Sequence, residues 1–180
     1  MESGSDGSLR PRDLTAELLL GRYLTRVHRF AVMVSPRGVE PDDLAQQALL
    51  RALEAINSFD PRRGTLDAWL WRIVVNVGRD AGRVVRRREL LVERLARDHS
   101  RVGASPEAVA LDQLRDRELV AAIRDLPRRY RSLIALRYGV GLSADEAAAV
   151  LGTTRMAVAK ATRRALDTLR ARLVAMEEEQ

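Results

Sequence analysis

Apolar residues recur every three or four positions along most of this chain of 180 residues, a spacing that places them on one face of successive α-helices. The pattern is clearest between Leu142 and Arg172, where two helical stretches meet at a short turn. Runs of β-branched residues are few. The pattern therefore predicts an all-α chain, with residues 142–172 forming a pair of helices.

Local signals mark both ends of the first helix in this pair. Ser143 followed by Glu146 forms a capping box, in which each side chain satisfies a free backbone donor at a helix start. Gly152 is suited to ending the helix, because glycine adopts a positive φ without a Cβ clash. Thr153 and Thr154 then offer the N-cap of the second helix.

The second helix of the pair has an apolar face and a cationic face. The apolar face comprises Val158, Thr162, Ala165, Leu166, Leu169 and Leu173. The opposite face comprises Met156, Ala157, Lys160, Arg163 and Arg164. Ala148, Gly152 and Val158 also stand where a helix-turn-helix has a small packing residue, a turn glycine and an apolar plug. We expect a DNA-binding helix-turn-helix, with an ordinary helical hairpin that carries a solvated basic face as the alternative.

Two helices are expected in the first third of the chain. One ends near Val34, and the next runs from Pro41 to about Asn57. The polar face of the second comprises Asp43, Gln46, Gln47, Arg51 and Glu54. Leu50 lies within that polar face. An isolated exposed leucine is common, but its position at the centre of a mixed-charge stripe also favours contact with a partner.

The segment from Asn57 to Thr65 is predicted to be a loop, since it contains an Asp-Pro step and a glycine. Its Phe59, Arg62 and Arg63 combine an aromatic ring with two guanidinium groups, which suits an unstacked base and its phosphates. A surface loop whose phenylalanine packs inward fits the same sequence equally well.

A long helix should follow, capped by Thr65. The face expected to be buried comprises Leu66, Trp69, Leu70, Ile73, Val77 and Val84. The face expected to be exposed comprises Trp71, Arg72, Val75, Arg79 and Arg86, so Trp71 should project outward among arginines. Gly78 and Gly82 lower helix stability by up to about 1 kcal/mol each relative to alanine, which indicates a close approach or a bend there.

A change in composition near residues 99–105 predicts a boundary between two small helical domains. Ser105 and Pro106 signal a new helix at that point, and Pro127 should open another. The predicted division is a disordered tail (1–12), a first domain (13–98), a linker (99–105), a helix-turn-helix domain (106–174) and an acidic tail (175–180).

Charge and composition favour a nucleic-acid partner. The net charge is +6, and every one of the 31 basic residues except Lys160 is an arginine. Arginine binds phosphates bidentately and stacks on bases, although a compositional bias of the genome would give the same count. The chain has no cysteine, and His28 and His99 are isolated, so disulfides are excluded and neither a zinc site nor a cofactor is expected. Without a spanning apolar run or a signal peptide, we expect a cytoplasmic protein that does not insert into membranes.

Two separate stretches resemble one family. Residues 41–88, in particular DDLAQQALLRAL and FDPRRGTLDAWLWRIVVNVGRD, resemble the second conserved region of bacterial sigma factors of the extracytoplasmic-function (ECF) group. Residues 119–173, especially LPRRYRSLIALRYGVGLSADEAAAVLG, resemble their fourth region. The resemblance implies a helical initiation factor of two domains that binds core RNA polymerase and brings it to selected promoters.

The resemblance also implies residue roles. The surface for the polymerase clamp would comprise Asp43, Gln46, Gln47, Leu50 and Arg51. The residues that melt promoter DNA and hold the single strand would be Asn57, Phe59, Arg62, Arg63, Trp71, Arg72, Asn76 and Arg79. The upstream element would be read in the major groove by Arg155, Met156, Lys160, Arg163 and Arg164. An anti-sigma protein is a further partner that the family alone leads us to expect.

The sequence departs from the family at several positions. Ala159 and Ala161 stand where basic residues are frequent, and Gln47 replaces a frequent acidic residue. Two other classes of protein stay open: a dimeric helix-turn-helix regulator whose N-terminal domain senses a ligand or dimerises, and a polymerase-associated adaptor that does not initiate. An enzyme is not expected, because the sequence shows no paired carboxylates, metal cluster or nucleophile motif.

Overall fold

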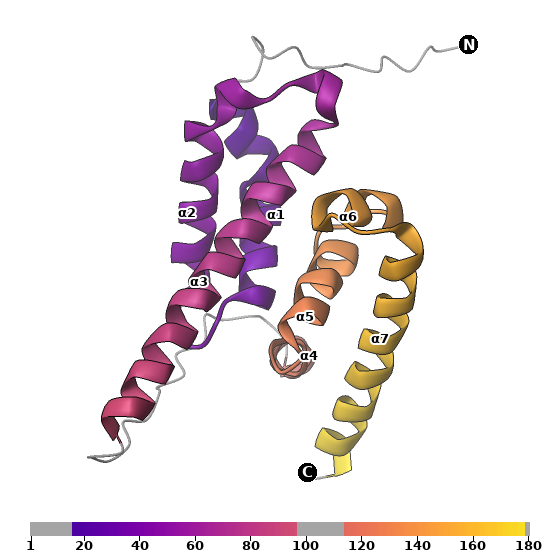
Figure 1. The fold of residues 1–180 in the computed structure, drawn as a ribbon. Helices are drawn as coiled ribbons and strands as arrows, with labels where there is room; N and C mark the ends of the chain where they lie inside the picture. The colour runs from indigo at the N-terminus through magenta and orange to yellow at the C-terminus, as the bar shows by residue number, and fades with distance from the viewer. Residues whose placement is uncertain (1–15, 97–113, 179–180) are drawn as a thin grey trace.

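The computed structural model describes residues 16–96 and 114–178, and within those ranges its regular elements are all helical. The helices fall into two groups that lie side by side (Figure 1). The first group contains α1 (Ala16–Val34), α2 (Pro41–Glu54), the short turns η2 (Ile56–Ser58) and η3 (Pro61–Arg63), and α3 (Leu66–Ala96). The second contains α4 (Leu114–Arg124), α5 (Arg128–Ile134), the π-helical turn η4 (Ala135–Gly139), α6 (Ala144–Leu151) and α7 (Arg155–Glu178).

Some of the predicted boundaries lie outside the described residues. These are the tail 1–12, the linker 99–105 and the helix start at Ser105 and Pro106. The division into two domains therefore stays a prediction. No described helix is long and apolar enough to cross a membrane.

The first group is built around large buried side chains from α1 and α3. Tyr23, Phe30, Leu70 and Trp71 are fully buried and belong to one continuous core with the apolar face of α2. The local signals operate as predicted: Oγ1 of Thr65 accepts a hydrogen bond from the Ala68 amide (3.1 Å), which caps the first turn of α3. The second helix ends at Glu54 rather than near Asn57, because the chain tightens there into η2.

The second group owes its geometry to the helix ends that the sequence marks. Ser143 and Glu146 form the predicted capping box, and Gly152 ends α6 in the left-handed conformation with φ of 67°. Oγ1 of Thr154 accepts from the Ala157 amide (3.2 Å) at the start of α7. Leu133, Ala147, Ala148 and Val158 form a small buried cluster that fixes the angle between α6 and α7. The prediction of a helix-turn-helix is confirmed at the level of the fold.

The two groups pack directly against each other. α1 contacts α4, α5 and η4, and α3 contacts α6. Leu136, Val140, Leu142 and Val150 of the second group belong to the same buried cluster as Trp71 of the first. The second group's other two clusters are small and contain alanines from α4, α6 and α7. Part of its apolar surface is therefore buried only because the first group covers it.

Candidate nucleic-acid interface

The start of α7 presents an uncovered face of basic and apolar side chains. Arg155, Met156, Lys160, Arg163 and Arg164 are all exposed, and Met156 keeps 81% of its accessible surface. Val158, Ala165 and Leu169 on the other side are buried. The predicted orientation of α7 is confirmed. A guanidinium nitrogen of Arg155 lies 3.6 Å from Oδ2 of Asp145, an exposed pair that links the two helices of the motif.

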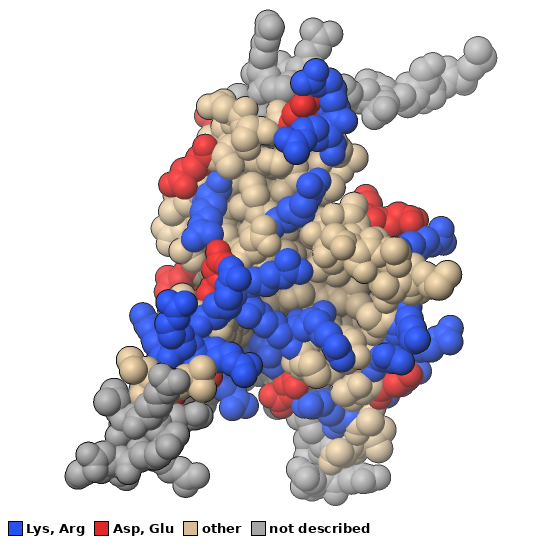
Figure 2. Space-filling model, viewed as in Figure 1, with Lys and Arg blue, Asp and Glu red and all other residues tan. Residues whose placement is uncertain are grey.

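A second exposed stripe runs along α3. Arg72, Asn76, Arg79 and Arg83 follow one another at intervals of three and four residues, and all are exposed. Nε of Arg72 donates to the Ala68 carbonyl (3.1 Å), and Arg79 donates to Oδ1 of Asn76 (3.5 Å). Figure 2 shows Lys and Arg side chains gathered over the second half of α3 and continuing onto the second group of helices. Such a stripe suits a phosphate backbone.

Asp80 is the acidic residue beside this stripe. It pairs with Arg83 and with Arg51 of α2, the latter at 3.1 Å. The hydrogen bond from Arg83, reinforced by that from Arg51, holds the pKa of the Asp80 carboxyl below its ordinary value. The pairing joins α2 to α3 and orients Arg51 within the polar face of α2.

The prediction that Trp71 projects outward is wrong. Its side chain is completely buried, with its ring centroid 5.7 Å from that of Phe30 and the guanidinium of Arg26 5.5 Å from its own. Val75, expected on the same exposed face, is also buried. The reason is that α3 contacts α1, α2 and α6, and α1 supplies the residues that lie against Trp71, so the buried surface of α3 is wider than a single apolar stripe. The prediction for Val84 is wrong in the opposite sense. It was expected to be buried, but it lies beyond the covered part of the helix and is 50% exposed.

The loop before α3 exposes its charged side chains to solvent, but its aromatic ring is buried. Phe59 is buried and packs against Trp69, with ring centroids 5.7 Å apart, so the inward alternative holds and the expected base-stacking position of Phe59 is wrong in this structure. Asn57, Arg62 and Arg63 are exposed. Arg62 forms a double hydrogen bond with the Asp60 carboxylate, which lowers the pKa of Asp60 and shapes the turn η3.

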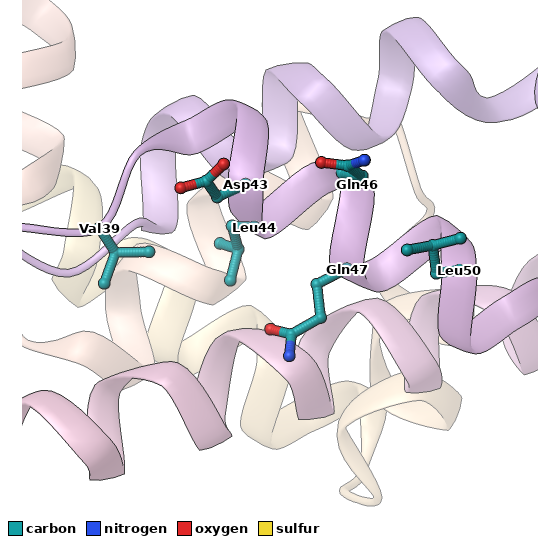
Figure 3. Close-up of a pocket in the computed structure, with 6 residues that line it drawn as sticks. All are labelled: Val39, Asp43, Leu44, Gln46, Gln47 and Leu50. Atoms are coloured by element: carbon teal, nitrogen blue, oxygen red, sulfur yellow. The ribbon is translucent and has the colours of Figure 1, made fainter.

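The outer face of α2 is the third candidate surface. Asp43, Gln46, Gln47, Leu50 and Arg51 are all exposed, and Leu50 keeps 52% of its accessible surface, while Leu49 beside it is buried. Figure 3 shows the shallow hollow that Val39 and α2 form there, with Leu50 at one end. The predicted exposure of Leu50 is confirmed.

An apolar groove continues from this hollow between α1 and α2. It is lined by Leu20, Leu24, Leu49, Leu50 and Leu53, and Nε2 of His28 lies 2.8 Å from Oδ1 of Asp42 at its side. Leu24 is 54% exposed. Sequence patterning did not single out Leu24, because a leucine at helical spacing in α1 is expected to be buried.

Comparison with known proteins gives matches over both groups of helices. The family model for sigma-70 region 2 matches residues 19–89, and that for sigma-70 region 4 matches residues 116–169. The chain is 33% identical over 137 residues to the ECF RNA polymerase sigma factor SigE of Mycolicibacterium smegmatis, covering 74% of this chain and only 52% of that relative. It is 35% identical over 145 residues to the ECF sigma factor EcfG of Rhodopseudomonas palustris, covering 80% and 77% of the two chains.

A solved structure with a similar fold is the sigma factor RpoE in complex with the anti-sigma factor NepR from Bartonella quintana. Its TM-score is 0.67 at 25% identity, and the match covers 87% of this chain and 95% of that one. The match extends across both groups of helices, as the two family models do.

Proposed function

The chain belongs to the ECF group of sigma-70 factors, and we propose that it binds core RNA polymerase and directs it to selected promoters. The observation that supports this most strongly is the separation of three uncovered polar faces, on α2, on α3 and on α7, over the two conserved regions. Residues 13–98 would act as the polymerase-binding and melting domain, and residues 106–174 as the domain that reads the upstream element.

The face of α2 is the proposed site for the polymerase clamp. It combines Leu50 with Asp43, Gln46, Gln47 and Arg51, so an apolar side chain is surrounded by polar groups that stay solvated in the free protein. An apolar anchor with a polar rim is typical of protein interfaces. The groove beside it, with Leu24 and Leu53, extends the apolar part of this surface.

The start of α7 is the proposed reader of the upstream element. Arg155, Met156 and Lys160 lie nearest to the turn of the helix-turn-helix, where recognition helices contact base edges. Arg163 and Arg164 lie further along the helix and would contact phosphates, because a straight helix leaves the curved groove with length. Ala159 and Ala161 add no charge, which limits the affinity of this domain for DNA by itself.

For melting, the exposed stripe of α3 replaces Trp71 as the proposed single-strand surface. Arg72, Asn76 and Arg79 have the exposure that contact with the strand needs, and Asn57, Arg62 and Arg63 of the preceding loop lie before the same helix. Guanidinium groups bind phosphates and stack on bases. Trp69, half-buried beside Phe59, is the aromatic residue nearest to this loop in the sequence that retains some exposure.

An anti-sigma protein is the proposed regulator. The RpoE neighbour is bound to an anti-sigma factor, and it matches nearly the whole of this chain in fold. The apolar groove between α1 and α2 gives such a partner a surface that also serves the polymerase, so inhibition would follow from competition.

The test is in vitro transcription with purified core polymerase on a promoter library. Transcripts that depend on both proteins, and that start downstream of a shared sequence motif, would support the proposal. An adaptor would alter transcription only in the presence of another sigma factor. A repressor would bind DNA as a dimer and give no transcripts of its own.

A further inference from the structure

One carboxylate links two of the proposed surfaces. Oδ2 of Asp80 in α3 accepts a 3.1 Å hydrogen bond from Arg51 in α2, and its Oδ1 accepts one from Arg83, three residues further along α3. Arg51 lies on the exposed face of α2 that is the proposed polymerase site, and Arg83 lies on the exposed stripe of α3. Each oxygen of Asp80 therefore holds an arginine of a different surface.

Arg83 extends the proposed single-strand surface beyond the residues that the sequence indicated. It follows Arg79 by four residues and Asn76 by seven, so the three side chains lie along one face of α3. The side chain of Arg83 is 75% exposed. A guanidinium has five donors, so the bond to Asp80 leaves others available to the phosphate of a strand that follows the stripe.

Asp80 is a firm support for these two arginines. α2 packs against α3, and the side chain of Asp80 keeps only 37% of its accessible surface. The hydrogen bonds from Arg83 and Arg51 hold the pKa of its carboxyl below the ordinary value, so the group is ionised at neutral pH. A long arginine side chain loses rotamer freedom when it binds a partner, and an existing hydrogen bond reduces that loss. The pairing therefore prepares both arginines for binding.

We propose that Asp80 is a positioning residue for both surfaces. It acts through Arg51 on polymerase binding and through Arg83 on binding of the promoter strand, and it contacts neither partner itself. The proposal rests on the proposed function, to which it adds Arg83 as a DNA contact and Asp80 as the residue that orients it.

The charge of Asp80 alone would have the opposite effect on DNA. A carboxylate beside a row of arginines repels phosphates, so removal of the charge would strengthen DNA binding and make it more dependent on salt. Loss of a positioned arginine weakens DNA binding and makes it less dependent on salt. The direction of change in a variant without this charge separates the two effects.

The test compares Asp80→Asn with the natural chain in two binding measurements. Titration with core polymerase gives the first affinity, and binding of the holoenzyme to a promoter with an unpaired melted segment, at several salt concentrations, gives the second. Asp80→Asn should lower each affinity about threefold to tenfold and reduce the salt slope of promoter binding. Glu17→Gln is the matched control, because it removes one exposed carboxylate from α1, outside both surfaces. It should change each affinity by less than about twofold.

Variants of the two arginines show whether Asp80 acts through them. Arg51→Ala should lower affinity for core polymerase, and Arg83→Ala should lower promoter affinity and reduce its salt slope by about one unit. Asp80→Asn should add no further loss of core affinity to Arg51→Ala, and no further loss of promoter affinity to Arg83→Ala, since the side chain that it positions is absent.

Motion of the arginine side chains measures the positioning without polymerase or DNA. Nitrogen relaxation at Nε of Arg51 and Arg83 should show greater mobility in Asp80→Asn than in the natural chain. If the mobility rises as expected but no chain binds core polymerase or promoter DNA, the result refutes the proposed function rather than the pairing.

Three results would each overturn the proposal, with thermal melts to confirm folded proteins. They are an unchanged core affinity in Asp80→Asn, a promoter affinity that stays the same or rises, and losses that add fully to those of Arg51→Ala and Arg83→Ala. If Asp80→Asn did not fold, Asp80→Glu would serve instead, because it keeps the charge and shifts the carboxylate by one methylene. Both affinities should fall in that variant too, whereas a pure charge effect predicts no change.

Discussion

α7 and α3 are both long amphipathic helices with arginine-rich faces, yet their sequence patterns predict their orientations with unequal success. α7 packs against α4, α5 and α6, all on one side, and the residues expected to face outward do so. α3 packs against α1 and α2 and also against α6, which approaches from another direction. A helical wheel assumes one narrow buried face, so it assigned Trp71 and Val75 to solvent, although both are buried and Phe30 and Arg26 of α1 lie against the ring of Trp71.

The difference shows how to interpret an aromatic residue among arginines. The arginine that contacts the ring of Trp71 belongs to α1. Arg26 lies over the ring, donates to the Val140 carbonyl and pairs with Asp67 at 3.1 Å. Its position makes the tryptophan part of the contact between the two groups. Exposed arginines and a buried ring therefore follow one another along α3. A helical wheel drawn with a single buried face places them on the same mixed surface.

Substitution of the two tryptophans of α3 should have the largest effect on stability. Trp71→Ala should lower the free energy of unfolding by about 3 to 5 kcal/mol, because a fully buried ring leaves a cavity. Trp69→Ala should cost less, since its ring is only half-buried. Denaturant unfolding measures both. A larger loss for Trp69 than for Trp71 would contradict the buried stripe of α3.

Met156→Ala is the control on α7 for that pair. With 81% of its surface exposed, its loss should change stability by less than about 0.5 kcal/mol. A strongly destabilised Met156→Ala protein would show that the outward face of α7 is also covered.

The outward face of α7 should separate into base contacts and phosphate contacts. Lys160→Ala should change which promoters are preferred, at a cost of about 1 to 3 kcal/mol for its best sequence, whereas Arg164→Ala should weaken all sequences alike and lower the salt slope by about one unit. Holoenzyme binding to a promoter library at several salt concentrations measures both effects. Equal, sequence-independent losses in the two variants would assign Lys160 to the phosphates.

α2, like α7, has one buried face and one exposed face. Leu50→Glu should lower affinity for core polymerase about tenfold through loss of an apolar anchor, while unfolding stays nearly unchanged. Leu49→Glu is the matched variant on the buried side, where a charge without a partner should prevent stable folding. Titration with core polymerase measures the affinity. If Leu50→Glu bound as tightly as the natural chain, α2 would not belong to the polymerase interface.

Local features of the fold were predictable, and contacts between distant segments were not. The capping box, the turn at Gly152, the caps at Thr65 and Thr154 and the exposure of Leu50 each depend on residues close in sequence. The contact of Arg128 with Gly82 joins residues 46 positions apart, and that of Met33 with Gly139 joins residues 106 positions apart. The sequence does contain one indication of the contact between Arg128 and Gly82, since two glycines in one long helix are unfavourable unless another segment packs closely against them.

The predictions that the rings of Phe59 and Trp71 are available to a base are wrong for the same physical reason. Each is an aromatic residue near arginines, and a single sequence does not distinguish a ring that awaits a base from one that packs beneath a neighbouring segment. Trp69 covers Phe59, and Phe30 with Arg26 covers Trp71. Both covering partners lie at least ten residues away or on another element, beyond the range of local signals.

The capping box of α6 tests whether the second group of helices depends on local signals more than the first does. The side chain and then the backbone amide of Ser143 hold the pKa of Glu146 below its ordinary value of 4.5. A pKa that is lower in the folded state adds stability above the unfolded value, and that stability is lost as the pH falls through the folded value. Stability should therefore decline below about pH 4.5, where Glu146 takes up a proton more readily in the unfolded chain.

Ser143→Ala should cost about 0.5 to 2 kcal/mol at neutral pH, and Glu146→Gln should remove this acid-dependent part while retaining a hydrogen-bonding side chain. Thr65→Ala is the matched variant in the first group, where the larger core should leave unfolding cooperative after the cap is lost. In the second group, whose own clusters are small, loss of the cap should instead let α6 and α7 exchange their amide hydrogens before the rest of the chain unfolds. Hydrogen exchange resolved by segment measures this. Uniform exchange across both groups in Ser143→Ala would mean that their contact makes them one cooperative unit, with stability shared through Trp71 and Val150 rather than assigned to each region.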